Sequence, residues 1–199
     1  MTNFVEQTYR DGAVNLAAYE PFTQVHGPGD RFAIWTQGCE QRCEGCANPE
    51  MLSLKEKELI VPEKLIYLVR SQVESAFPVE GITLMGGEPV LQAKGLETVV
   101  AEVKEMGLNV LLFTGYTIEQ LREVNSAAVN KLLDLVDTVI DGSFCLDKLD
   151  VELIRGSVNQ RIIHFSDSLK GRDFSRKSPE HFVNAHGGKV EIITTGFNF

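Results

Sequence analysis

Apolar and polar residues repeat along the chain in patterns that predict helices and strands in turn. Residues 62–75 begin with proline and repeat apolar side chains at helical spacing. These side chains are Leu65, Ile66, Leu68, Val69 and Val73. Residues 92–107 predict a second helix that ends at a glycine. A further helical stretch is expected to run across residues 118–124 and 130–135.

Short runs of apolar, β-branched and aromatic residues predict about six strands. The runs are residues 32–37, 81–87, 109–116, 136–143, 160–165 and 189–196. Residues 166–187 are polar and are expected to form a loop with a short helix. Strands that alternate with helices indicate βαβ units, and therefore an α/β fold with a mostly parallel sheet. The strands are too few for a closed eight-stranded barrel, which leaves an open partial barrel or a doubly wound sheet.

The length and charge of the chain limit the classes of protein to which it can belong. The 199 residues predict one domain, and no apolar run approaches the roughly 20 residues that cross a membrane. The first residues lack the basic and apolar regions of a secretory signal, so we expect a cytoplasmic protein that does not bind a membrane. The formal charge of -9 argues against binding to a nucleic-acid backbone.

Four motifs each follow a predicted strand. They are the cysteine motif at 39–46, "GGEP" at 86–89, "TGY" at 114–116 and "DGS" at 141–143. In both candidate folds, the carboxyl ends of parallel strands meet at one edge of the sheet, where sites form. The order of the motifs therefore predicts a functional site at that edge.

The segment "CEQRCEGC" places Cys39, Cys43 and Cys46 within eight residues. A disulfide framework is disfavoured in the cytoplasm, and a catalytic thiol would need only one cysteine. Structural zinc would need a fourth ligand, such as His26, and usually a second short cysteine pair. An iron–sulfur cluster with four irons would be held by three thiolates, which leaves one iron open for chemistry. Zinc and the cluster are the two hypotheses that these residues leave open.

The CxxxCxxC spacing directly after a strand resembles the radical S-adenosylmethionine superfamily. Within it, the chain looks like the activases of glycyl radical enzymes, especially those that act on anaerobic ribonucleotide reductase. The likeness covers about residues 24–165, and residues 166–199 contain no motif that matches the family. Its segments are "GPGDRFAIWTQGCEQRCEGCANPE" (27–50), "LMGGEP" (84–89), "FTGYT" (113–117), "VDTVIDGSF" (136–144) and "IRGSVNQRII" (154–163). Two positions depart from common patterns: Gly45 replaces an aromatic residue, and His26 replaces the Asp of pyruvate formate-lyase activases.

This resemblance implies a radical S-adenosylmethionine domain with the form of an open partial (β/α) barrel, which holds a [4Fe-4S] cluster on Cys39, Cys43 and Cys46. S-Adenosylmethionine would bind the open iron, and its reductive cleavage would yield a 5′-deoxyadenosyl radical. The radical would take hydrogen from a glycine of a partner, the large subunit of anaerobic ribonucleotide reductase, with an electron donor such as flavodoxin. The cofactor-binding residues expected on this basis are Gly45, Cys46, Ala47, Gly86, Gly87, Glu88, Thr114, Gly115, Asp141, Ser143, Asn159 and Arg161.

Alternatives remain for the function and for single residues. A free-standing radical enzyme that acts on a small metabolite or a peptide would use the same cofactors. An electron carrier would need four cysteine ligands, and the remaining Cys145 lies about 100 residues further along the chain. Gly86 and Gly87 suit a close approach of the cofactor to the main chain, but they also suit a plain turn. Asp141 and Arg161 fit a binding role or ordinary turn and surface roles.

Overall fold

The computed structural model describes residues 4–177, 180–186 and 189–195. Its helices are α1 (Pro62–Val73), α2 (Ala93–Glu105), α3 (Ile118–Val124) and α4 (Ala127–Leu135), and four short 3-10 turns lie between elements. Its strands are β1 (Val14–Thr23), β2 (Arg31–Thr36), β3 (Glu58–Ile60), β4 (Gly81–Gly86), β5 (Asn109–Phe113), β6 (Thr138–Asp141), β7 (Arg161–His164), β8 (Glu180–His186) and β9 (Lys189–Thr195). None of the helices in the described residues is long and apolar enough to cross a membrane.

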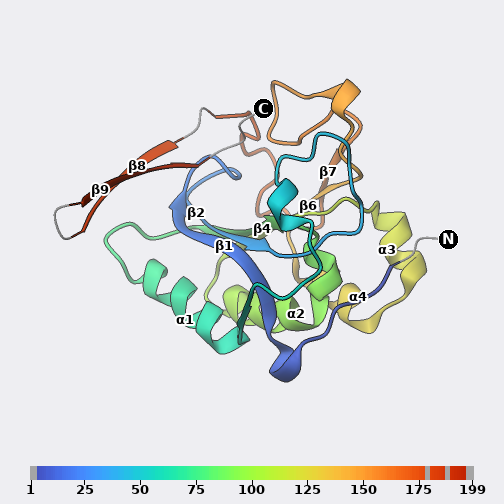
Figure 1. The fold of residues 1–199 in the computed structure, drawn as a ribbon, viewed down its shortest axis with the longest axis horizontal. Coiled ribbons are helices and arrows are strands. Elements are labelled where there is room, and N and C mark those ends of the chain that lie inside the picture. The colour runs from blue at the N-terminus through green and yellow to red at the C-terminus, as the bar shows by residue number, and fades with distance from the viewer. Residues whose placement is uncertain (1–3, 178–179, 187–188, 196–199) are drawn as a thin grey trace.

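Seven strands form the main sheet, in the order β3-β1-β2-β4-β5-β6-β7 (Figure 1). The middle strands β2, β4, β5 and β6 are parallel to one another. The flanking pairs β1–β2, β1–β3 and β6–β7 are antiparallel. The predicted α/β class is therefore confirmed, while a mostly parallel arrangement holds only for the middle of the sheet.

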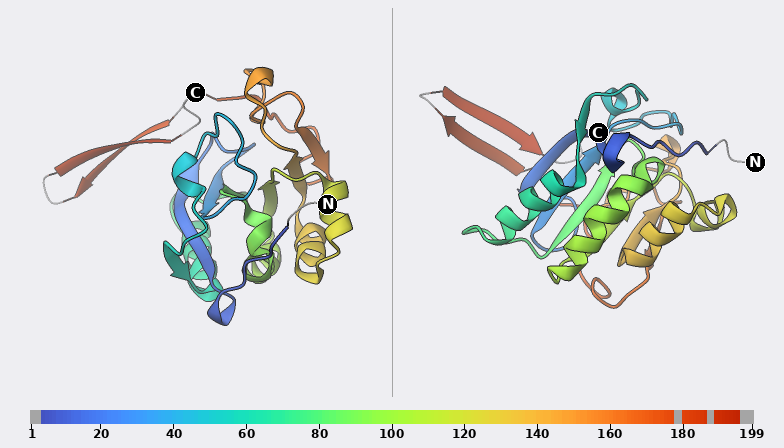
Figure 2. Two further views of the ribbon diagram at one scale, coloured as in Figure 1. Left: turned by 45° about the vertical axis from the view of Figure 1, so that its right-hand side comes forward. Right: turned by 90° about the horizontal axis from the view of Figure 1, so that it is seen from below.

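One face of the sheet packs against the helices. Alternate residues of the parallel strands, such as Phe32 and Ile34 of β2, enter a core shared with Leu96 and Val100 of α2. Because side chains alternate between faces along a strand, every second residue joins this core. Figure 2 shows α1, α2 and α4 together on this face. The connections between the parallel strands therefore place these three helices on the same face of the sheet.

The opposite face is covered by loops instead of helices. Leu111 of β5 and Ile140 of β6 form a second, smaller core there. The segment that follows β6 supplies Ile154, and the segment after β7 supplies Leu169 and Phe174. The segments after β6 and after β7 thus pack on the inner face of the sheet.

The structure also departs from the predicted elements. Strands β1 and β3 had no clear periodicity in the sequence. The single helical stretch predicted over 118–135 is divided, because Asn125 adopts a left-handed conformation (φ 52°) and Ser126 caps α4. The short helix expected within 166–187 is wrong for the residues described there: 166–177 form turns, and β8 is a strand. Strand β9, which was predicted, pairs with β8 in a separate two-stranded sheet.

Candidate active site

The cysteine loop, defined here as residues 37–48, begins where β2 ends. Gly38 has a φ of 103°, a left-handed value that favours glycine, and it turns the chain out of the strand. The N–H of Gly38 donates to the carbonyl of Met51 (2.8 Å), and that of Cys39 donates to Leu52 (3.4 Å). The N–H of Glu88 donates to the Gly38 carbonyl (2.8 Å). The base of the loop is thereby attached to the turn after β4.

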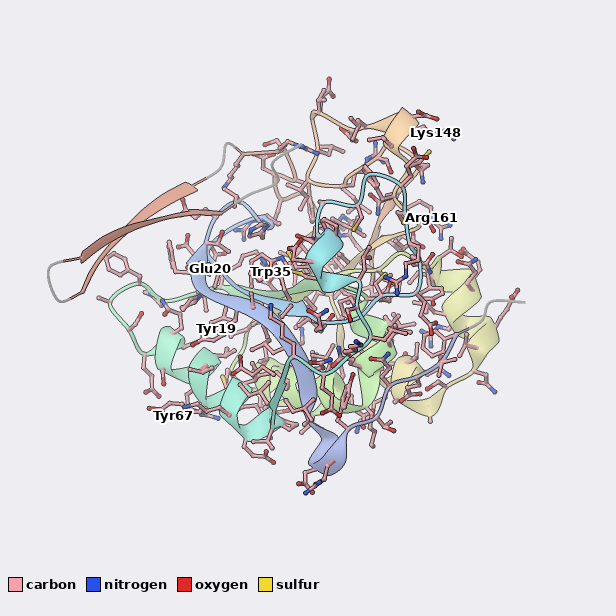
Figure 3. The ribbon with its side chains drawn as sticks, viewed as in Figure 1. Tyr19, Glu20, Trp35, Tyr67, Lys148 and Arg161 are labelled. Carbon is pink, nitrogen blue, oxygen red and sulfur yellow. The ribbon has the colours of Figure 1, made fainter. Side chains whose placement is uncertain are left out.

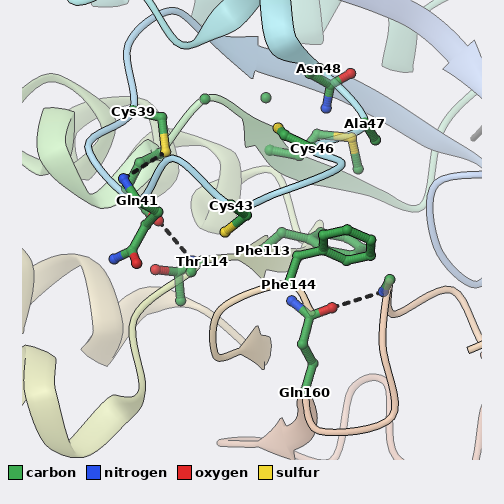
Figure 4. Close-up of a pocket in the computed structure, with 16 residues that line it drawn as sticks. Cys39, Gln41, Cys43, Cys46, Ala47, Asn48, Phe113, Thr114, Phe144 and Gln160 are labelled. Atoms are coloured by element: carbon green, nitrogen blue, oxygen red, sulfur yellow. Dashed lines mark hydrogen bonds between the residues drawn. The ribbon is translucent and has the colours of Figure 1, made fainter. Parts of the chain in front are cut away.

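A pocket lies between this loop and the ends of β4, β5 and β6 (Figure 4). Its walls include most of the residues that the sequence predicted for cofactor and metal. The lining residues are Cys39, Gln41, Cys43, Cys46, Ala47, Asn48, Met85, Gly86, Gly87, Glu88, Phe113, Thr114, Gly115, Phe144, Gly156 and Gln160. Three of the four predicted motifs, the cysteines, "GGEP" and "TGY", therefore contribute lining residues to one pocket, and no residue of "DGS" (141–143) lines it.

The three thiols of the loop are free and lie in a partly buried setting. Burial raises the pKa of Cys39 to about 11, and burial also raises the pKa of Cys43. The Cys39 Sγ atom accepts the N–H of Gln41 (3.4 Å), and the Cys43 thiol accepts the main-chain N–H of Phe144. Thiols bind metal as thiolates, so metal binding at this site releases protons.

The arrangement of the thiols fits a cluster better than a single ion. Among the described residues, no three His, Cys, Asp or Glu side chains form a group that could hold one metal ion. His26, the suggested fourth zinc ligand, packs edge-on against Trp35 with ring centres 4.9 Å apart. In an iron–sulfur cluster each thiolate binds a different iron, so the sulfur atoms need not converge on one point. The zinc hypothesis is not supported, and the donor set of three thiols fits a [4Fe-4S] cluster.

The "GGEP" turn brings a buried carboxylate to the pocket. Gly86 has a φ of 110°, and a Cβ atom there would lie 2.6 Å from the main-chain nitrogen of Thr36, so only glycine fits. Glu88 is 1% exposed, and its carboxylate accepts the N–H groups of Gly115 (2.7 Å) and Val90 (3.3 Å). Burial raises the pKa of Glu88 to about 7. The carboxylate thus holds the end of β5 against the turn after β4.

Four predicted residues lie at the ends of β6 and β7 beside the pocket and are not among its lining residues. Arg161 donates from Nε to Asp141 (2.8 Å) and pairs with Glu119 (2.7 Å). These carboxylates raise the pKa of Arg161, and Arg161 lowers that of Glu119 to about 2. The Asn159 amide donates to the carbonyl of Ser143 (2.8 Å). Figure 3 shows Arg161 near α3, the helix that carries Glu119. This group joins β6, β7 and α3.

Several lining residues were not predicted from the sequence. Met85 lies two residues after Thr83, and Phe113 lies two residues after Leu111. Residues two apart in a strand share a face, so strand periodicity could have indicated both lining residues. Other lining residues had no periodicity to indicate them, because they come from the segment after β6 or from the cysteine loop. They are Gln41, Asn48, Phe144, Gly156 and Gln160. Gly45, which was predicted, is absent from the lining: a Cβ there would lie 2.9 Å from Leu146 Cδ1.

Cys145 lies much closer to the site than its position in the sequence indicates. The preceding residue, Phe144, lines the pocket and donates its N–H to Cys43. The Cys145 N–H donates to the hydroxyl of Ser157 (3.1 Å). Cys145 itself is not a lining residue of the pocket. Three thiols, not four, therefore face this pocket.

Comparison with known protein families gives a match over most of the chain. Residues 25–163 match the family described as "4Fe-4S single cluster domain". The matched region contains the cysteine loop and all the residues that line the pocket.

Individual relatives carry activase names. The chain is 30% identical to the anaerobic ribonucleoside-triphosphate reductase-activating protein of Salmonella typhimurium, over 73% of this chain and 96% of that protein. It is also 30% identical to the protein of that name in Vibrio cholerae, over 77% of this chain and 99% of that protein. The pyruvate formate-lyase-activating enzyme of Staphylococcus aureus is 36% identical over 78% of this chain and 62% of that enzyme.

Proposed function

Because this chain belongs to the 4Fe-4S single cluster domain family and to the anaerobic ribonucleoside-triphosphate reductase-activating proteins, we propose that it cleaves S-adenosylmethionine reductively and generates a glycyl radical on a partner enzyme. The partner proposed is anaerobic ribonucleotide reductase. The observation that carries the proposal is one pocket lined by three thiols of a single loop and by the "GGE" and "TG" strand ends. Three thiolates leave one iron of a cubane cluster free to bind a cofactor.

The residues of the chain hold and shield the cofactors. Cys39, Cys43 and Cys46 would each bind one iron. When bound, the reduced cluster would supply one electron for reductive cleavage of S-adenosylmethionine, and the cleaved cofactor would supply the oxidant that removes one hydrogen atom from the partner's glycine. Met85 and Phe113 give the pocket apolar walls that exclude water from this reaction.

The remaining cofactor contacts in the proposal follow the pocket walls. Gly86 and Gly87 line the pocket and carry no side chains, which allows the methionine part of S-adenosylmethionine to approach their main chain closely. The other contacts proposed on these walls are Ala47, Glu88, Thr114 and Gly115. Gly45, which lies in the cysteine loop outside the lining, stays a proposed contact on the resemblance alone. Four further residues lie beside the pocket at the ends of β6 and β7, and we propose them as contacts for the sugar of S-adenosylmethionine. They are Asp141, Ser143, Asn159 and Arg161.

The proposal extends to the whole chain and its surroundings. We propose that residues 1–199 form one radical S-adenosylmethionine domain, and that its curved sheet is an open partial barrel. Packing of Leu169 and Phe174 on the inner face of the sheet supports one unit rather than two. A single three-thiol motif needs an external electron source, so we propose a donor such as flavodoxin in the cytoplasm.

The test is the partner's radical itself. Anaerobically reconstituted protein, mixed with S-adenosylmethionine, a reductant and the reductase from the same source, should give the doublet of a glycyl radical by electron paramagnetic resonance. A reductase whose reacting glycine is changed to alanine should give no doublet. If deoxyadenosine forms only with a small metabolite or short peptide and the reductase gives no radical signal, the activase proposal is wrong and the protein is a free-standing radical enzyme.

A further inference from the structure

Gln41 occupies the middle position between Cys39 and Cys43, where the cysteine motif itself sets no residue type. Its N–H donates to the Cys39 Sγ atom (3.4 Å), which fixes the start of the cysteine loop. Its side chain lines the same pocket as the thiols (Figure 4). Main chain and side chain of this one residue thus contact opposite parts of the site.

The Gln41 side chain reaches the ends of two strands. A Cβ atom at Gly115 would lie 2.9 Å from Gln41 Cγ, so the lack of a side chain there permits the close approach. The Ser143 hydroxyl lies 3.1 Å from Gln41 Oε1 and 3.0 Å from the Gly115 carbonyl. A hydroxyl has one proton and shares it between these two acceptors. Residues 102 positions apart in the sequence are joined in this way.

The strand ends that Gln41 contacts are themselves held from the far side. The N–H of Gly115 donates to the buried carboxylate of Glu88 at the turn after β4 (2.7 Å). The amide of Asn159, just before β7, donates to the Ser143 carbonyl (2.8 Å). The ends of β4, β5, β6 and β7 therefore form one connected set of hydrogen bonds, and the Gln41 carboxamide joins the cysteine loop to it.

We propose that Gln41 is a positioning residue: through Ser143 and Gly115 it sets where the cluster-binding loop stands relative to the strand ends that receive S-adenosylmethionine. This inference rests on the proposed function, because it assigns the two sides of the pocket to the two cofactors. Gln41 touches neither reacting atom in this account. Its effect passes through the placement of the loop, and misplacement by about 1 Å is enough to slow a reaction strongly.

The test compares Gln41→Leu with Gln72→Leu. Leucine is close in size to glutamine and removes the carboxamide. Gln72 lies on α1, and its amide donates to Ser75 Oγ (3.1 Å) and to the Phe77 carbonyl (2.7 Å), away from the pocket. Both variants keep the three thiols, so both should bind wild-type amounts of iron and sulfide. Only Gln41→Leu should raise the KM for S-adenosylmethionine, by about tenfold for one lost hydrogen bond at the site.

Two readouts do not depend on turnover. In the metal-free protein, the amides of the cysteine loop and of residues 142–145 should exchange hydrogen faster in Gln41→Leu than in wild type or Gln72→Leu. In the reduced, cluster-loaded protein, the change in the electron paramagnetic resonance spectrum on addition of S-adenosylmethionine should be smaller in Gln41→Leu. Unchanged exchange together with an unchanged spectrum would overturn the proposal.

Ser143→Ala provides the second variant, because it removes the same connection from the other side. Ser143 also bonds the Gly115 carbonyl, so Ser143→Ala has a loss of its own. The loss in the double variant should still be smaller than the sum of the two single losses, because both changes break one shared interaction. Additive losses in KM would contradict the proposal. If Gln41→Leu shows the expected shifts while the wild-type protein cleaves S-adenosylmethionine without activating the reductase, the positioning role stands and the proposed partner fails. If wild type activates the reductase and Gln41→Leu matches Gln72→Leu, only the positioning role fails.

Discussion

Cys39, Cys43 and Cys46 differ from Cys145 in what surrounds each thiol. The first three line the pocket, whereas Cys145 follows a lining residue without joining the lining. Burial raises the pKa values of Cys39 and Cys43, so these thiols stay protonated at neutral pH until a metal takes the proton's place. At the scale of single residues, the chemistry therefore depends on which thiols face the pocket.

Replacement of the cysteines one at a time tests this distinction. The wild-type protein, reconstituted without oxygen, should bind about four irons and four sulfides per chain. Cys39→Ala, Cys43→Ala and Cys46→Ala should each lose most of both, because a thiolate ligand is missing. Cys145→Ala is the matched control and should keep them. Iron and sulfide assays with absorption spectra measure the result, and loss of the cluster in Cys145→Ala would show that the pocket needs a fourth thiol.

Glu88 gives a prediction about pH. Burial raises its pKa from 4.5 to about 7 in the folded chain, so the folded state holds this proton more tightly than the unfolded chain does. The stability that this group contributes is present below its unfolded pKa and is lost as pH rises through 7. Between about pH 4.5 and pH 8 this amounts to about 3 kcal/mol.

Urea unfolding of metal-free protein at about pH 5 and about pH 8 measures this effect. The wild-type protein should lose more stability over that interval than Glu88→Gln, which has no proton to release. The comparison cancels the contributions of other titrating groups, including His26, whose pKa burial lowers to about 4. Parallel pH profiles for the two proteins would show that Glu88 titrates as an ordinary exposed carboxyl group.

Turns and caps decide where each element stops and therefore where its end residues lie. The turn after β4 returns to β2 through the Gly87 N–H, which donates to the Thr36 carbonyl (2.8 Å). This bond places "GGE" beside the root of the cysteine loop. On the helical face, the left-handed Asn125 and the cap at Ser126 divide α3 from α4, so that α4 can pack along α2.

Ser126→Ala tests the division between α3 and α4. The Ser126 hydroxyl accepts the Val129 N–H (3.3 Å) and donates to Glu6 (2.6 Å). Its loss should lower the free energy of unfolding by about 1 kcal/mol. Ser71→Ala is the control, because that hydroxyl bonds only within the exposed surface of α1, to the Tyr67 carbonyl (2.8 Å). Chemical denaturation measures both, and equal stability of the two variants would contradict the assigned cap.

In the whole molecule, the main hydrophobic core and the pocket lie in different parts of the main sheet. Helices cover one face of the main sheet, and the pocket lies at the carboxyl ends of its parallel strands. The matched family region ends at residue 163, and the relatives in Salmonella typhimurium and Vibrio cholerae are covered over nearly their whole length. Strands β8 and β9 pair with each other in a sheet of their own. The main sheet and the pocket are therefore complete without that hairpin.

Truncation after Lys177 follows from this arrangement. The shortened chain keeps the segment that supplies Leu169 and Phe174 to the inner core. Its metal-free form should unfold within a few degrees of the full chain, and it should bind the same iron and sulfide. Calorimetry and iron assays measure this. A chain cut after Phe165 is the contrast and should be clearly less stable, because it lacks Leu169 and Phe174. A large loss of stability or iron in the first truncation would show that the hairpin belongs to the fold.

The sequence alone determined the parts of the site that follow strand ends. Periodicity located β2, β4, β5 and β6 closely, and each is followed by a motif. Parallel strands place their carboxyl ends at one edge, so the order of motifs was enough to predict that Cys39, Gly86 and Thr114 would meet. The helices of the outer face were also predictable, because the spacing of their apolar residues is a local pattern.

Tertiary structure decided what depends on residues far apart in the chain. It brought Phe144 to Cys43, joined Gln41 to Ser143, and paired Arg161 with Asp141 and Glu119 beside the pocket. It also set the antiparallel flanks of the sheet, where β1 carries no regular alternation of buried and exposed residues. A local pattern of apolar residues predicts which face of an element is buried. It does not predict which distant residue a polar side chain will bond, because that depends on how the whole chain packs and pairs its buried polar groups.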